Sequence, residues 1–334
     1  MKILVSGYHN PNFLTITEYI EGAIRKLGNK LYAFDDRKHL FPKRLRNKFC
    51  LLNRISIQWI NHSLLRMVSK HQPDLVLVTG GHRILESTIR KLKGFLRTVL
   101  WTTDPPIDFS NIKTAARAYD HVFCQGTEAV ELLDKLGLVA HWLPMACEPQ
   151  IHRHVEISSE ERSVFGNNIV FVGSYYPTRY TLFEKLYGFD FGIWGPGWNR
   201  LENSSNLRSC LKGDHIKPEQ WVKIYNASKI VLATHYQDSK NKFPVFQASP
   251  RIFEAMACGA FVISDYQKDV FTVFKDKKHL VGFNNENDLI DKIKYYLHNP
   301  SERKAIAKLG RKEVLKNHKY VDRIKTLLSI VDRN

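Results

Sequence analysis

The sequence predicts an α/β protein with two Rossmann-like domains that face each other across a cleft, followed by C-terminal helices. Short apolar runs that suit strands alternate with helical patterns along nearly the whole 334-residue chain. The alternation occurs twice, and a polar stretch with two prolines, residues 143–168, separates the halves. Helices between strands form right-handed crossovers, so each half is expected to contain a parallel sheet covered on both faces. A chain of this length can bury two sizeable cores.

The expected strands are runs rich in β-branched and aromatic residues. In the first half they lie near 2–6, 30–34, 75–79, 97–102, 120–124 and 140–144. In the second half they lie near 168–172, 189–194, 229–234, 260–264 and 279–283. We therefore expect an N-terminal domain over 1–147, a connection over 148–167, a C-terminal domain over 168–315 and a final helix over 316–334.

The composition indicates a cytosolic protein. No run reaches the about 18 apolar residues of a membrane-spanning helix. The opening MKILVSGYHNPNF holds too short an apolar run for a signal-peptide core, so we expect a first strand there. The five cysteines are scattered, odd in number and free of C-x-x-C spacing. We expect reduced thiols, with neither disulfides nor zinc.

The formal net charge of +17 favours anionic partners such as anionic lipid, nucleic acid or a phosphorylated substrate. Residues 37–70 contain nine Lys or Arg and no Asp or Glu. Pro42 can start a helix there, which predicts a basic amphipathic element for an anionic membrane surface. Its apolar side would consist of Leu45, Phe49, Leu52, Trp59 and Ile60. The alternative is that this side packs into the first domain while the charges face water.

Two glycine-containing turns follow strands of the second half, where open α/β sheets bind ligands. In FVGSYYPTR, Gly173 and Ser174 allow close backbone approach to a phosphate, and Arg179 can add a charged contact. In WGPGW, Gly195 lies in a tight turn and Trp198 offers a face for a planar base. The alternatives are an ordinary strand-to-helix turn and a pair of core aromatic residues.

The stretch SPRIFEAMACGAFVISDY, residues 249–266, predicts a capped helix and then a buried strand. Ser249 suits the N-cap, Pro250 suits the first helical position, and Gly259 ends the helix. Glu254 can accept two hydrogen bonds from a vicinal diol, and Arg251 with the helix N-terminus can face a diphosphate. The alternative is a surface ion pair between Arg251 and Glu254, which contributes only about 0.2–0.5 kcal/mol.

This stretch resembles the nucleotide-sugar motif of GT-B glycosyltransferases, in particular the CgeB-like (spore-protein type) family. FVGSYYPTR, WGPGW, KIVLATHY and the C-terminal helices follow in the order of that family, and WTTDPP with AYDHVFCQ is similar to its N-terminal half. The resemblance implies that the second domain binds the donor, that the first binds the acceptor, and that no metal is needed. It implies that Glu254 holds the donor ribose and that Arg251 lies near the diphosphate. Many retaining relatives carry another Glu eight residues earlier, where this chain has Phe246, so neither that sugar contact nor a retaining outcome is carried over.

The first domain is expected to supply the acceptor site and the base. His82 and Asp104 each follow a strand, and either can act as the base. Gly7 and His9 end the first strand and are expected on the acceptor side. His235 ends KIVLATHY and is expected near the donor sugar. No DxD pair for a metal-bound diphosphate and no Walker A motif is present.

The sequence therefore predicts a metal-independent, cofactor-free glycosyltransferase that uses a nucleotide-diphosphate sugar. The expected acceptor is a cell-envelope or surface glycan, free or lipid-linked, and the expected location is the cytoplasm or the inner membrane face. A non-catalytic nucleotide-sugar-binding relative stays open as an alternative. A nucleic-acid-binding protein also stays open because of the charge, although no recognisable module interleaves basic and aromatic residues.

Overall fold

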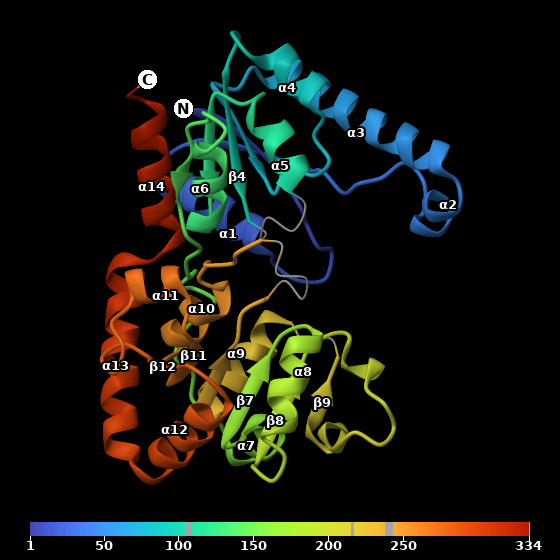
Figure 1. The fold of residues 1–334 in the computed structure, drawn as a ribbon. Helices are drawn as coiled ribbons and strands as arrows, with labels where there is room; N and C mark the ends of the chain where they lie inside the picture. The colour runs from blue at the N-terminus through green and yellow to red at the C-terminus, as the bar shows by residue number, and fades with distance from the viewer. Residues whose placement is uncertain (104–108, 215–216, 238–242, 334) are drawn as a thin grey trace. The chain divides into compact units, whose positions relative to one another are not determined.

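The computed structural model describes residues 1–103, 109–214, 217–237 and 243–333 (Figure 1). These residues form two compact units, 1–144 with 320–334, and 145–319. Each unit is an α/β layer structure, which confirms the predicted fold class. The segment 148–167 lies inside the second unit and contains a short helix, α7 (Ser159–Phe165). The last helix, α14 (Tyr320–Val331), belongs to the first unit.

The first unit is built on a parallel six-stranded sheet with the order β2-β1-β3-β4-β5-β6. Its strands are β1 (Lys2–Gly7), β2 (Lys30–Asp35), β3 (Leu75–Thr79), β4 (Arg97–Thr102), β5 (His121–Cys124) and β6 (His141–Trp142). Its helices are α1 (Ile16–Lys26), α2 (Lys43–Lys48), α3 (Cys50–His71), α4 (Glu86–Leu92), α5 (Phe109–Ala116), α6 (Thr127–Asp134) and α14. Every residue of β3 is buried, as expected for a central strand covered on both faces. Tyr320 of α14 packs against Tyr19 of α1 with ring centroids 5.8 Å apart.

The second unit also contains a parallel six-stranded sheet, with the order β12-β11-β10-β7-β8-β9. Its strands are β7 (Ile169–Val172), β8 (Phe191–Trp194), β9 (Leu211–Gly213), β10 (Ile230–Ala233), β11 (Val262–Asp265) and β12 (Val281–Phe283). Its helices are α7, α8 (Pro177–Glu184), α9 (Pro218–Ala227), α10 (Pro250–Cys258), α11 (Lys268–Val273), α12 (Glu286–His298) and α13 (Pro300–Asn317), with two short 3₁₀ turns at Trp198–Arg200 and Asn206–Cys210. One face of this sheet packs an aromatic cluster that includes Phe171, Phe183 and Trp198.

Each of the strand regions expected from the sequence contains a strand, and β9 is an addition. The three residues of β9 are too few to give a pattern, so only pairing with β8 defines this strand. The five cysteines are free thiols, of which Cys50 is exposed. Among the described residues, no helix combines the length and apolar character needed to cross a bilayer.

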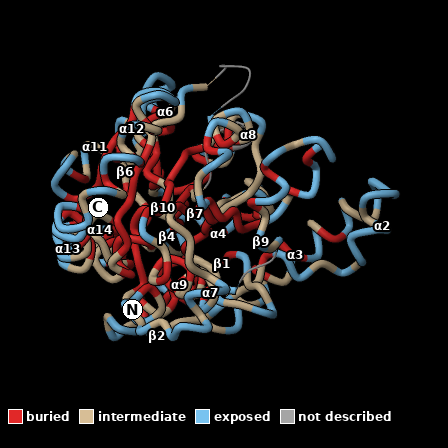
Figure 2. Tube along the Cα trace, turned by 90° about the horizontal axis from the view of Figure 1, so that it is seen from below, coloured by how far each residue is buried: buried red, intermediate tan, exposed pale blue. Residues whose placement is uncertain are grey.

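Most strands of the sheets are buried, whereas one part of the first unit is largely exposed (Figure 2). The central strands are buried, whereas α2 buries none of its residues. In α3 the buried residues begin only at Ser56, and the start of the helix is half-buried or exposed. Figure 1 shows α2 at the outer end of α3, away from the sheet of this unit.

Candidate donor-binding site

The predicted helix after Ser249 is present as α10, with Pro250 at its first position and Gly259 at its C-cap. Gly259 has φ 91°, a left-handed conformation that glycine adopts without strain. Ser249 makes no side-chain capping bond, unlike the prediction. Its backbone N–H instead donates to Nε2 of His235 at 3.0 Å. The start of α10 is therefore held by a histidine from the end of β10.

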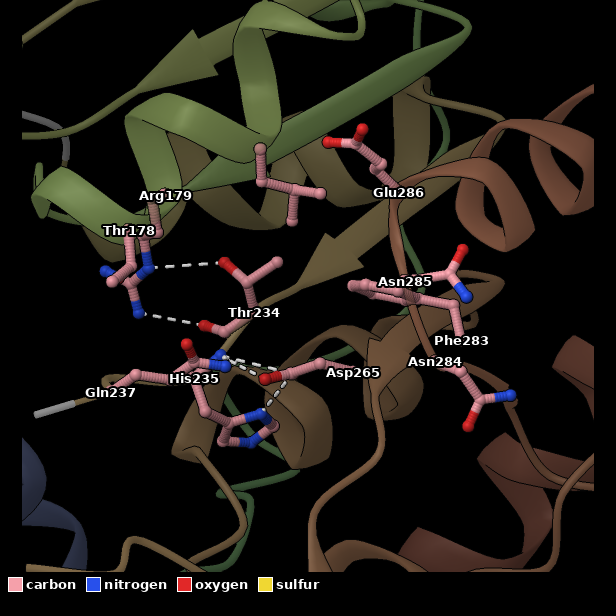
Figure 3. Close-up of a pocket in the computed structure, with 11 residues that line it drawn as sticks. Thr178, Arg179, Thr234, His235, Gln237, Asp265, Phe283, Asn284, Asn285 and Glu286 are labelled. Carbon is pink, nitrogen blue, oxygen red and sulfur yellow. Dashed lines mark hydrogen bonds and ion pairs between the residues drawn. The ribbon is translucent and has the colours of Figure 1, made fainter. Parts of the chain in front are cut away.

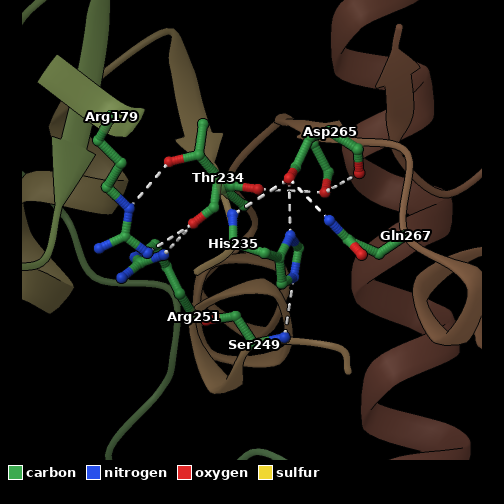
Figure 4. Close-up of polar contacts among 9 residues, drawn as sticks. Arg179, Thr234, His235, Ser249, Arg251, Asp265 and Gln267 are labelled. Carbon is green, nitrogen blue, oxygen red and sulfur yellow. Dashed lines mark hydrogen bonds and ion pairs between the residues drawn. The ribbon is translucent and has the colours of Figure 1, made fainter. Parts of the chain in front are cut away.

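Arg251 and Glu254 form no ion pair in the structure, so the surface-pair alternative is wrong. The Arg251 guanidinium donates to the backbone oxygens of Val172 and, at 3.3 Å, Thr234. Its Cζ lies 4.7 Å from the centroid of the Phe171 ring. Arg251 thus contacts the carboxyl ends of β7 and β10, as Figure 4 shows for Thr234.

Arg179 places a second guanidinium beside the first. Its Nη2 donates to the Thr234 backbone oxygen at 2.8 Å, and its Nη1 donates to the Ser174 oxygen at 2.8 Å. Its Cζ lies 5.0 Å from the centroid of the same Phe171 ring. Burial and then the neighbouring Arg251 charge lower the pKa of Arg179 to about 9. Within the described part of the chain neither arginine forms an ion pair with a carboxylate, and the charges of Asp265 and Glu254 act on them only from beyond ion-pair distance.

The glycines of the two turns serve this packing. A Cβ on Gly173 would overlap Nη2 of Arg251. Gly195 has φ 127°, and a Cβ there would lie 2.5 Å from the Gly173 oxygen. The N–H of Gly173 donates to the Trp194 oxygen at 2.8 Å, which joins the two turns. Both positions therefore require glycine for the close approach of neighbouring protein groups.

Trp198 does not present its ring to a ligand, contrary to the expected base platform. It is 1% exposed and stacks on Phe183 with centroids 5.7 Å apart. Its indole N–H donates to the Gly173 oxygen at 2.8 Å. Trp198 therefore fixes the Gly173 turn from within the core, as expected for the alternative in which it is a core aromatic residue.

His235 is held by protein groups on both ring nitrogens, and it also lines the cavity described below. Its Nδ1 lies 2.6 Å from Oδ1 of Asp265, and its Nε2 accepts the Ser249 N–H. This pattern assigns the Nδ1–H tautomer, with both ring nitrogens engaged. Burial acts to raise the pKa of Asp265, but the interactions with His235 and Gln267 outweigh it and the pKa is lowered. The His235 side chain is buried and links β10, β11 and the start of α10 (Figure 4).

Glu254 has a carboxylate with no hydrogen-bond partner among the described residues. Its side chain is 14% exposed, and Nε2 of His152 lies 3.9 Å from Oε1. Burial raises the pKa of Glu254 to about 7, an effect that the charge of Arg251 partly opposes. The sequence did not point to His152, because this residue lies in the stretch interpreted as a connection, 102 residues before Glu254. Its Nδ1 accepts the Glu148 N–H at 3.0 Å, so Nε2 carries the proton in the neutral ring.

A cavity of about 190 Å³ borders Arg179 at the carboxyl ends of β10, β11 and β12 (Figure 3). Its lining comes from α8, these strand ends and the start of α12. The residues that sequence reasoning did not single out include Thr234, Asp265 and Asn284. They lie at the carboxyl ends of different strands, and only the order of the strands in the sheet brings them together.

The residues expected on the acceptor side lie in the first unit. Gly7 ends β1, where a Cβ would overlap the side chain of Thr79. Nε2 of His9 is 2.8 Å from Oε1 of Glu21, and this hydrogen bond raises the pKa of His9. His82 is exposed and follows β3. Asp104 lies outside the described residues.

The two parallel sheets define a protein of two Rossmann-like α/β units, and the second unit carries an arginine pair at its strand edge. Comparison with known proteins narrows this class. Residues 179–329 match the profile of a glycosyl transferase-like family. The spore protein CgeB of Bacillus subtilis (strain 168) is 24% identical over 268 residues, which cover 75% of this chain and 80% of that protein.

Solved structures show the same fold. Sucrose-phosphate synthase from Thermosynechococcus elongatus aligns with a TM-score of 0.72 at 12% identity, over 99% of this chain and 98% of that chain. Anabaena HepE in complex with UDP-glucose aligns with a TM-score of 0.65 at 10% identity, over the full length of both chains. An alpha-glucosyltransferase in complex with UDP-glucose and DNA containing an abasic site aligns with a TM-score of 0.68 at 10% identity, over 99% of both chains. The resemblance to GT-B, CgeB-like glycosyltransferases that the motifs indicated is confirmed.

Proposed function

We propose that this protein transfers a sugar from a nucleotide-diphosphate sugar to an acceptor hydroxyl. The observation that carries the proposal is the pair of guanidiniums, Arg179 and Arg251, which lie over one phenyl ring at the carboxyl edge of the second sheet and form no ion pair with any described residue. Adjacent like charges are unfavourable unless an anion binds between or beside them. The UDP-glucose named in the structures of two similar folds supports a diphosphate as that anion.

Glu254 completes the proposed donor site. Its unpaired, partly exposed carboxylate can accept both hydroxyl protons of a ribose, which would compensate the burial that raises its pKa. The α10 N-terminus adds partial positive charge on the same side as Arg251.

The arginines are proposed to replace a metal ion. The bond between the sugar C1 and the diphosphate oxygen breaks, the bond from the acceptor oxygen to C1 forms, and the leaving diphosphate keeps the electron pair. Fixed positive charge beside the leaving oxygen stabilises this charge without metal. If transfer inverts the anomeric centre, the acceptor proton passes to His82 or Asp104; comparison of His82→Ala with Asp104→Asn at saturating donor would identify the base.

A screen of nucleotide sugars tests the function. Incubation with UDP-, GDP-, ADP-, CDP- and dTDP-sugars in EDTA should release free nucleoside diphosphate from at least one donor. Arg251→Gln should abolish this release, and Lys308→Gln, which removes an exposed charge from α13, should not. Nucleotide binding without turnover on any donor would support the non-catalytic relative. Binding of duplex DNA without nucleotide binding would support the nucleic-acid alternative.

We further propose that the acceptor is a glycan at the inner membrane face, because α2 and α3 fit an anionic bilayer surface. Six large apolar side chains there are between 36% and 66% exposed: Leu40, Leu45, Phe49, Leu51, Ile55 and Trp59. They alternate with the basic residues of 37–70, a stretch without carboxylates. The expected single helix is instead two, broken at Phe49, and Ile60 packs in the core rather than on the apolar side.

Vesicle co-sedimentation tests this location. Each basic residue near an anionic surface contributes about 1 kcal/mol, so binding should require anionic lipid and weaken as salt rises. The combined change of Lys43, Arg44 and Lys48 to Gln, or Leu51→Ser, should reduce it, while the same number of Lys→Gln changes on α13 should not. Equal recovery with neutral and anionic vesicles would contradict the proposal and favour a soluble acceptor.

A further inference from the structure

A second group of positive charges lies in the first unit, at the carboxyl ends of β2, β1 and β3. These strands are neighbours in the sheet, so the loops that follow them lie side by side. The loop after β2 is joined to the end of β1 because Asp36 N–H donates to the Gly7 oxygen at 3.1 Å. This edge is where open α/β sheets bind ligands, and the mechanism proposed above uses from it only the region of His82.

Three arginines come from three segments, and Arg37 and Arg46 each lie within electrostatic reach of Arg83. Arg37 follows β2, Arg46 lies in α2 and Arg83 follows β3. Burial lowers the pKa of Arg83, and the charges of Arg37 and Arg46 lower it further. The same three charges, added to burial, lower the pKa of His39 to about 4, so His39 is neutral at physiological pH. None of the three arginines forms an ion pair with a carboxylate in the described part of the chain.

The arginines are held in place by the fold. Nε of Arg46 donates to the Phe41 oxygen at 3.0 Å. The Arg37 guanidinium lies 4.7 Å from the centroid of the Tyr8 ring. Asn61, buried in α3, donates to the Arg83 oxygen at 2.9 Å and accepts from the Leu85 N–H at 2.8 Å, which fixes the loop after β3. Each arginine segment therefore has at least one fixed contact, although Arg37 is exposed and Arg46 lies on α2, which buries no residue.

Polar atoms around the arginines lack partners. Nδ1 of His39 and Nδ1 of His9 are buried without a hydrogen-bond partner among the described residues. Buried polar atoms are usually paired, and a site that binds a polar ligand leaves such atoms unpaired until the ligand arrives. The opposing charges are Asp35 and Asp36; burial raises the pKa of Asp36 to about 6, which weakens its ability to neutralise the arginines.

We propose that Arg37, Arg46 and Arg83 bind a phosphate group on the acceptor, so that the preferred acceptor is a phosphorylated sugar or a lipid-linked sugar phosphate rather than a neutral glycan. Guanidinium groups match phosphate oxygens with paired hydrogen bonds, and three of them suit a dianion better than a single carboxylate. The neutral His39 ring and His9 then supply hydrogen bonds to phosphate or sugar oxygens. That the bound molecule is the acceptor rests on the proposed function, but the phosphate site itself does not depend on sugar transfer.

Calorimetry on the full chain with glucose, glucose 6-phosphate and inorganic phosphate tests the site. Glucose 6-phosphate and phosphate should bind and glucose should not. Arg83→Gln should weaken phosphate binding by about tenfold or more, the effect of one charged hydrogen bond. Lys91→Gln, which removes an exposed charge on α4, should not change it. Arg83→Lys keeps the charge and should restore only part of the affinity, and Arg37→Gln, at an exposed position, serves if Arg83→Gln does not fold.

The donor site must be excluded as the phosphate site. Arg251→Gln should leave glucose 6-phosphate binding unchanged; loss in this variant, or equal loss in Arg83→Gln and Lys91→Gln, would overturn the inference. Competition by farnesyl phosphate in detergent against glucose 6-phosphate distinguishes a lipid-linked from a soluble source. Nucleotide binding is measured in parallel, so its absence would reject the proposed transfer, while the phosphate result still decides the acceptor-side site.

Discussion

The two arginine groups of the molecule are held in different ways. In the second unit, the guanidiniums of Arg179 and Arg251 donate to backbone oxygens at the strand ends, and both lie over Phe171. In the first unit, Arg37 and Arg83 come from loops, and Nδ1 of His39 and of His9 has no hydrogen-bond partner among the residues that the structure describes. A site whose arginines are anchored to the sheet is rigid before its ligand arrives, which suits stabilisation of a leaving group. A site with unpaired polar atoms gains hydrogen bonds only when a ligand binds, which suits recognition of one acceptor among many.

Arg251→Gln should have the largest effect of any single change. It removes the guanidinium that has the Gly173 turn on one side and the proposed diphosphate on the other. Loss of one fixed charge at a leaving group lowers kcat by about 10²–10³-fold. Lys308→Gln is the matched control. Donor-hydrolysis rates within threefold of wild type would show that the second-unit arginines are only structural.

Gly173→Ala should lower activity through Arg251, because its Cβ would displace that guanidinium. The reduction should be smaller than for Arg251→Gln, since the charge is kept. In the double variant the two effects should not add, because both act on one group. Additive losses would mean that Gly173 acts on the ligand directly, as the sequence first suggested.

Glu254→Gln should weaken donor binding by about 1–3 kcal/mol, the range for a charged hydrogen bond. The pKa of Glu254 is about 7 without ligand, and a ribose diol donates to the ionised form. Wild-type donor affinity should therefore rise from pH 6 to pH 8, and this rise should disappear in the variant.

The same carboxyl group should make the stability of the protein change with pH in the direction opposite to donor affinity. A carboxyl group whose pKa is raised by folding binds a proton more tightly in the native state, so wild-type stability should fall as pH rises from about 4.5 toward 7. Glu254→Gln should remove this fall, and above pH 7 the variant should be more resistant to urea than wild type. Parallel losses of affinity and stability would instead indicate a structural carboxylate.

His235→Ala should mainly lower stability, by about 1–3 kcal/mol, because it removes the imidazole bond to the buried Asp265 carboxylate and leaves the Ser249 N–H unpaired. Urea denaturation of His235→Ala and His235→Gln measures this loss. Normal stability with a selective loss of donor turnover would revive a direct sugar contact.

The sequence predicted the local features of the second unit well. The position of α10 follows from a proline and a glycine within ten residues, and the glycines of the two turns mark close approaches. The pairing of His235 with Asp265 could not be predicted, because the partner comes from a neighbouring strand thirty residues later. The orientation of Trp198 was open for a similar reason, since the aromatic rings around it come from β7, α8 and the loop between them.

In the first unit, the sequence indicated a charged amphipathic segment but not its break at Phe49 or the gathering of Arg37, Arg46 and Arg83. A basic run shows where charge is abundant. It does not show which side chains meet, because that depends on the strand order β2-β1-β3 and on Asn61, which anchors a distant loop.

The central claim is that the guanidinium pair of Arg179 and Arg251 binds the donor diphosphate without metal. Calorimetric titration of the nucleoside diphosphate and of the matching nucleoside, in EDTA, tests it directly on wild type, Arg251→Gln and Lys308→Gln. Wild type and Lys308→Gln should bind the diphosphate far more tightly than the nucleoside, and Arg251→Gln should lose most of that preference. An unchanged preference in Arg251→Gln, or diphosphate binding that appears only when Mg²⁺ or Mn²⁺ is added, would contradict the claim.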